Sequence, residues 1–143
     1  MKKLQFFLIA LTIISCKDSL HEISESMSTN KLIKLTFDNN EQLYFKTNSH
    51  GISGNHQSIV LSNQTKTVYE KESDYIFYSS EIYYRTNKDS IIIYAPESGV
   101  VIPKNKSFKT IVSVIGLKNY DEIADYEKNY KAYKLQRLSV YSE

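Results

Sequence analysis

Apolar and polar residues alternate with a period of two along most of residues 31–143. Ile33, Leu35 and Phe37 would share one face of an extended segment, with Lys34 and Thr36 on the other. Because successive side chains of a strand point to opposite sides, this alternation predicts half-buried β-strands separated by turns. The predicted strands are 33–37, 43–47, 57–62, 65–71, 75–78, 81–86, 90–95, 99–102, 108–117 and 135–141.

The hydrophobic period changes near residue 119. Asn119 and Glu122 have the spacing of a capping box, which marks the start of a helix. Ile123, Tyr126 and Tyr130 then recur at intervals of three and four residues. These spacings predict one amphipathic helix over roughly 120–131.

The order of these elements predicts a mainly β fold for a single domain over residues 31–143. Many short strands with tight turns favour an antiparallel sandwich or an up-and-down, barrel-like meander, with one late α-helix followed by a final strand. A meander followed by a helix and a strand is similar to the chain order of the lipocalin-like barrel. That resemblance concerns topology alone, because the chain carries none of the lipocalin sequence motifs.

The N-terminus has the three regions of a secretion signal. Lys2 and Lys3 are basic, Leu4 to Ile14 is almost wholly apolar apart from Gln5 and Thr12, and the small Ser15 follows. The apolar run is about 11 residues long, whereas a helix that spans a bilayer needs about 20. Residues 1–15 are therefore predicted to be a signal peptide rather than a membrane span.

Residues Ile13 to Cys16 resemble the lipobox of bacterial lipoproteins, although that pattern prefers Leu where Ile13 stands. The resemblance implies that Cys16 carries diacylglycerol on its thiol, that cleavage occurs before it, and that fatty acyl chains such as palmitate anchor the protein in a membrane. The alternative is an ordinary signal peptide followed by a chance cysteine. The chain has only this one Cys, so no intrachain disulfide can form.

Residues 16–30 are polar and serine-rich, and they predict a flexible tether between the lipid and the domain. The residue after Cys16 is Lys17 and not Asp, which by similarity to enterobacterial sorting rules points to the outer rather than the inner membrane. Asp18, Glu22 and Glu25 give a sparse acidic character, which in Bacteroidota-like lipoproteins favours surface display. The sequence leaves open whether the domain faces the periplasm or the cell surface.

The net charge of the chain bears on only one class of partner, nucleic acid. The full chain of 143 residues has 18 Lys and Arg against 16 Asp and Glu, but two of the lysines belong to the signal peptide. The product without it is formally neutral, so net charge gives no reason to expect nucleic-acid binding. Lys104, Lys106 and Lys109 gather around one predicted turn and are interpreted as solvated turn residues.

One short segment carries candidate chemistry. His50, Ser53 and His56 lie in a glycine-containing connection, where two histidines could bind a metal ion or a serine could act as a nucleophile. The spacing matches no strong zinc pattern, and Asn55 stands where a nucleophile elbow requires Gly. We therefore assign no catalytic residue, metal or cofactor, and keep the three residues as candidate binding groups.

Tyrosine supplies the second candidate. Tyr83 and Tyr84 are adjacent in a predicted strand, so their side chains must point to opposite faces. One interpretation is an aromatic platform for a sugar, a peptide or a protein; the other is ordinary stabilisation of the sheet by cross-strand pairs.

These observations predict a lipid-anchored, non-enzymatic interaction module of the bacterial cell envelope. Its ligand would be an envelope protein, a glycan or a peptide, and nucleic acid is not expected. The alternatives are a small hydrolase or metal-dependent enzyme centred on residues 50–56, and a small-ligand carrier if the sheet forms an open barrel.

Overall fold

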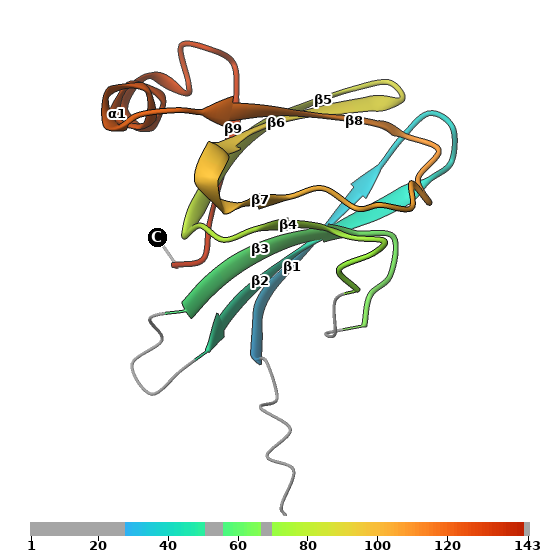
Figure 1. Ribbon diagram of the computed structural model, residues 1–143. Coiled ribbons are helices and arrows are strands. Elements are labelled where there is room, and N and C mark those ends of the chain that lie inside the picture. The colour runs from blue at the N-terminus through green and yellow to red at the C-terminus, as the bar shows by residue number, and fades with distance from the viewer. Residues whose placement is uncertain (1–27, 51–55, 67–69, 142–143) are drawn as a thin grey trace, which may run out of the picture.

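The computed structural model describes residues 28–50, 56–66 and 70–141, which form two β-sheets stacked face to face with one helix at an end of the stack (Figure 1). Sheet A has the strand order β1-β2-β3-β4-β7, and sheet B has the order β8-β6-β5-β9. The strands of sheet A are β1 (Ser28–Thr36), β2 (Gln42–His50), β3 (His56–Ser62), β4 (Tyr75–Phe77) and β7 (Val100–Val101). Those of sheet B are β5 (Glu81–Asn87), β6 (Ser90–Pro96), β8 (Ile111–Leu117) and β9 (Gln136–Ser139). The mainly β prediction is confirmed, and the sandwich alternative describes the fold, since the described strands form no closed barrel.

The first hairpin follows directly from its sequence. Strand β1 pairs antiparallel with β2, and Leu35 lies opposite Leu43. Asn40 in the connecting turn has φ 62°, a left-handed conformation that Asn tolerates better than most residues. The predicted hairpin around residues 38–40 is confirmed.

The pairing of β6 with β8 differs from the prediction of an antiparallel fold, because these two strands run parallel. After β6 the chain passes through a 3₁₀ turn (Glu97–Gly99), adds β7 to the edge of sheet A, and returns to sheet B as β8. The excursion to the other sheet lets β8 lie beside β6 in the same direction. Periodicity cannot report this, because alternation is the same for both directions.

The core fills the space between the two sheets. Phe45 from sheet A meets Tyr84 from sheet B with ring centroids 4.9 Å apart. The buried residues of this core are Phe37, Leu43, Phe45, Ile59, Leu61, Tyr75, Phe77, Ile82, Tyr84, Ile91, Ile93, Ala95, Leu138 and Val140. Side chains thus fill the space between the two sheets in the described part of the chain. The small-ligand carrier stays a prediction.

Helix α1 (Tyr120–Asn129) confirms the predicted helix and lies on the outer face of sheet B (Figure 1). The side chain of Asn119 accepts a hydrogen bond from the backbone N–H of Glu122, as the capping spacing predicted. Ile123 and Tyr126 of the helix pack against a buried cluster that includes Tyr83, and the ring of Tyr126 contacts that of Tyr83 on this face of the sheet. No helix within the described ranges is long and apolar enough to cross a membrane.

The strand predicted over 65–71 is wrong for the residues of it that the structure describes. Glu70 begins a turn in which its carbonyl oxygen accepts hydrogen bonds from the backbone N–H groups of Ser73 and Asp74. Asp74 closes the turn, because its carboxylate accepts a hydrogen bond from the backbone N–H of Glu70 at 2.9 Å. The local hydrogen bonds of an acidic turn thus replace a sheet ladder.

Candidate interaction surface

Tyr83 and Tyr84 point to opposite faces of β5, as predicted, but both are buried, with 3% and 4% of their surface exposed. Tyr84 lies in the core between the sheets, and Tyr83 lies beneath helix α1. Burial, and then a hydrogen bond from its hydroxyl to Glu81, raise the pKa of Tyr83. Neither ring can therefore serve as an aromatic platform on the surface.

The segment around residues 50–56 is described only at its ends. The antiparallel register of β2 and β3 places His50 directly opposite His56, while Ser53 lies outside the described residues. The described part of the chain contains no group of three or more His, Cys, Asp or Glu side chains that could hold a metal ion. A hydrolase or metal site there stays a prediction. Cys16 and the part of the predicted tether up to residue 27 also lie outside the described ranges.

The four strands at the edges of the two sheets, β1, β7, β8 and β9, differ in length and in charge. Strand β1 carries Lys31 and Lys34, and β9 has only four residues, one of them Arg137. Strand β7 is only two residues long. Short strands and charged side chains are common devices against unwanted pairing at a sheet edge.

Strand β8 has none of these devices. Its seven residues, Ile-Val-Ser-Val-Ile-Gly-Leu, include no charge and no Pro. In the described part of the chain it pairs with β6 alone, so its other side is an open edge. A long, uncharged edge strand is a template to which another strand can pair.

The backbone of β8 presents alternate residues to this edge. The N–H of Ile111 donates to the carbonyl oxygen of Asp89, 2.9 Å away, in the segment that leads into β6. Because backbone groups alternate in direction along a strand, those of Ser113 and Ile115 also point to β6, whereas those of Val112 and Val114 point outward. The open edge therefore offers the N–H and C=O groups of Val112 and Val114.

Two large apolar side chains flank these groups. Ile111 is 66% exposed and Ile115 is 44% exposed. Both lie on the outer face of sheet B, because the register with β6 places Ile115 beside Tyr94, and Tyr94 packs under α1 on that face. Helix α1 covers one end of this face, and the other end carries a groove lined by Arg85, Asn87, Ser90 and Ile92. The edge is thus apolar on a face that solvent reaches.

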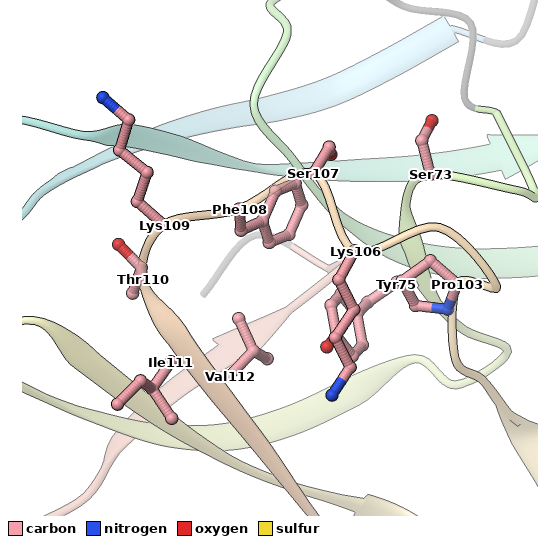
Figure 2. A pocket seen from close by; sticks show the side chains of 10 residues that line it. All are labelled: Ser73, Tyr75, Pro103, Lys106, Ser107, Phe108, Lys109, Thr110, Ile111 and Val112. Carbon is pink, nitrogen blue, oxygen red and sulfur yellow. The ribbon is translucent and has the colours of Figure 1, made fainter.

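A small cavity lies between the start of β8 and the loop that precedes it (Figure 2). Its volume is about 200 Å³, below the range of about 300–1,000 Å³ that is usual for drug-sized ligands. The ring centroids of Phe108 and Tyr75 lie 5.7 Å apart in its wall. In Figure 2 the side chain of Lys109 extends away from these rings. The lining residues are Ser73, Tyr75, Pro103, Lys106, Ser107, Phe108, Lys109, Thr110, Ile111 and Val112.

Glu41 holds this loop in place from the turn between β1 and β2. Its carboxylate accepts hydrogen bonds from the backbone N–H groups of Lys109, at 2.9 Å, and Thr110. Burial raises the pKa of Glu41, but the hydrogen bonds from Thr110 and Lys109 outweigh it, so the pKa lies below its ordinary value. These hydrogen bonds tie the start of β8 to the turn between β1 and β2.

The open edge of β8 could not be recognised from the pattern of the sequence, because the alternation of residues 108–117 is that of any strand. The one available signal was the absence of charge from residue 110 to residue 117.

Comparison with protein-family models, with curated proteins and with solved structures gave no match to this chain.

Proposed function

We propose that this chain is a lipid-anchored protein of the bacterial cell envelope that binds a protein partner without catalysing a reaction. The observation that carries the proposal is the open edge of β8, with its outward backbone groups at Val112 and Val114 and its exposed Ile111 and Ile115. The lipid anchor is proposed from the lipobox-like residues that end at Cys16.

An edge of this kind suits a protein better than a glycan. A strand added to β8 would bond its own N–H and C=O groups to those of Val112 and Val114, and would cover part of Ile111 and Ile115. A sugar prefers an exposed aromatic face, and the two rings predicted to supply one, Tyr83 and Tyr84, are buried. The edge therefore favours a protein or peptide among the partner classes that the sequence suggested.

The anchor would set where this binding occurs. Strand β1 begins at Ser28, so eleven residues, 17–27, separate it from Cys16. A chain of that length spans at most about 36–40 Å, which keeps the domain near the membrane that holds its lipid. Lys17 favours the outer membrane for that anchor.

The proposal is tested in intact cells with the full chain. A photoreactive p-benzoylphenylalanine in place of Ser113 should form adducts with a protein, since Ser113 is exposed in the middle of β8. The matched control places the same probe at Thr36, which is exposed on edge strand β1. Adducts from Thr36 and not from Ser113, or from neither, contradict a role for β8.

The anchor is tested in the same cells with a clickable palmitate analogue. The parent chain should become labelled and sediment with membranes, and the Cys16→Ala variant should do neither. Equal labelling of both chains would show that Cys16 is not the lipidated residue.

A further inference from the structure

The five residues at the start of β8 read the same in both directions: Ile111, Val112, Ser113, Val114 and Ile115. Two identical strands that pair antiparallel about a two-fold axis bring residue i of one copy opposite residue j of the other, and residue j opposite residue i. Because the sequence of these five residues is symmetric, an axis through Ser113 places residues of the same type opposite each other: Ile with Ile, Val with Val and Ser with Ser. We infer that the partner of β8 is a second copy of this chain, paired antiparallel about Ser113, an inference that rests on the proposed function.

The backbone N–H and C=O groups of β8 point in the alternating directions that this pairing requires. With Ser113 on the axis, Val112 lies opposite the partner's Val114, and these are the residues whose N–H and C=O groups point outward. They form hydrogen-bonded pairs on both sides of the axis. An axis through Val112 or Val114 would instead place residues of unlike size opposite one another, such as Ile111 opposite the partner's Ser113.

The side chains fit the same register. Ile111 lies opposite the partner's Ile115 on the outer face of sheet B, in a non-hydrogen-bonded pair, where side chains approach most closely. The two-fold axis repeats this pair, so four isoleucines form one apolar strip from groups that are 66% and 44% exposed in the single chain. No charged residue lies within β8 to oppose a second copy.

The size of the contact suits molecules that share a membrane. A pair of strands five residues long is smaller than the interfaces of about 1,200–2,000 Å² that hold stable complexes in solution. Lipid anchors confine the copies to one surface and raise their effective concentration, so a short strand pair can be populated there.

Cysteine cross-linking in the membranes of cells that express the full chain tests the register. Ser113 faces the partner's Ser113 in a non-hydrogen-bonded pair with Cα atoms about 4.5 Å apart, within the range for a disulfide. Ile111 would lie about 13–14 Å along the strands from the partner's Ile111, which is too far. Under mild oxidation Ser113→Cys should give roughly tenfold more disulfide-linked dimer than Ile111→Cys. The parent chain beside them reports any link through Cys16.

Charge substitutions give a second test that does not depend on oxidation. Replacing both Ile111 and Ile115 by Lys places like charges opposite each other twice and should reduce dimer roughly tenfold. The variant Ile111→Lys with Ile115→Glu pairs opposite charges twice across the axis and should restore dimer. Chemical cross-linking of membranes measures both variants, and circular dichroism confirms that each exposed substitution leaves the fold intact.

The outcomes separate this inference from the proposed function. Linked dimer from Ser113→Cys together with rescue by the mixed-charge variant supports the inference. Equal linking at positions 111 and 113, no linking at either, or no rescue overturns it. If the Ser113 photoprobe then yields adducts with a different protein, the proposed function stands and only the second copy is excluded; if it yields none, both fall.

Discussion

On one side of the sandwich the chain itself bonds the two sheets together, whereas on the other side the outer backbone groups of β8 have no strand partner among the described residues. On the closed side, Lys31 of β1 donates from Nζ to the carbonyl oxygens of Ser139, at 3.0 Å, and Tyr141, at 2.7 Å. Within sheet B, the N–H of Val140 donates to the carbonyl oxygen of Ser80, 2.8 Å away, and extends the pairing of β9 with β5. The two bonds from Lys31 use carbonyl oxygens at the outer edge of β9 that another chain could otherwise use.

On the open side, the start of β8 is held in place although its outer backbone groups have no strand partner among the described residues. Glu41 fixes the loop at Lys109 and Thr110, and Phe108 packs on Tyr75 in the wall of the small cavity. The edge of β8 is thus held in one conformation while its outer groups stay available. The closed side therefore contributes stability, and the open side is where an interaction can occur.

The largest expected effect is on the free energy of unfolding, compared between the closed and the open side of the sandwich. Leu138 of β9 is 2% exposed and belongs to the core, so Leu138→Ala should lower the free energy of unfolding by about 2–5 kcal/mol. Val112 of β8 is only partly buried, and Val112→Ala should cost about 1 kcal/mol. Denaturant unfolding of the two variants measures both values. Equal losses would show that the two sides contribute alike.

A pair of proline variants separates pairing within the chain from pairing with a partner. The N–H of Ser113 points to β6, so Ser113→Pro removes a ladder hydrogen bond and should cost about 1–3 kcal/mol. The N–H of Val114 points outward, so Val114→Pro should destabilise the fold less and yet abolish binding at the edge. Denaturant unfolding together with cross-linking in membranes measures both effects. If Val114→Pro leaves binding unchanged, β8 does not bind by strand addition.

The smallest effect concerns the loop that positions β8. The hydrogen bonds to Glu41 hold its pKa below the ordinary 4.5, so its carboxylate stabilises the folded chain above about pH 4.5. This contribution should disappear as the pH falls through the lowered pKa. Glu41→Gln should cost about 0.5–1.5 kcal/mol at pH 7. In denaturant titrations from pH 7 to pH 3, the difference between the two chains should shrink toward zero. A constant difference would show that Glu41 acts through packing and not through its charge.

Local pattern predicted most of the elements. The hairpin of β1 and β2 and the helix after Asn119 depend on nearby residues, through a turn and a cap, and both are confirmed. The strand predicted over 65–71 is wrong because the acidic turn from Glu70 to Asp74 makes local hydrogen bonds that alternation does not reveal.

The amino-acid pattern was sufficient to predict most of the strands, the start of the helix, and the opposite directions of Tyr83 and Tyr84, because each depends on backbone geometry over a few residues. The pattern did not reveal that α1 covers Tyr83, that β8 runs parallel to β6, or that β8 has an open edge in the described part of the chain. These features depend on which distant segments become neighbours, and the alternation of a strand is the same whether it has one neighbour or two. The symmetric run around Ser113 can be seen in the sequence, but it bears on pairing with a second copy only because the fold places it at an edge.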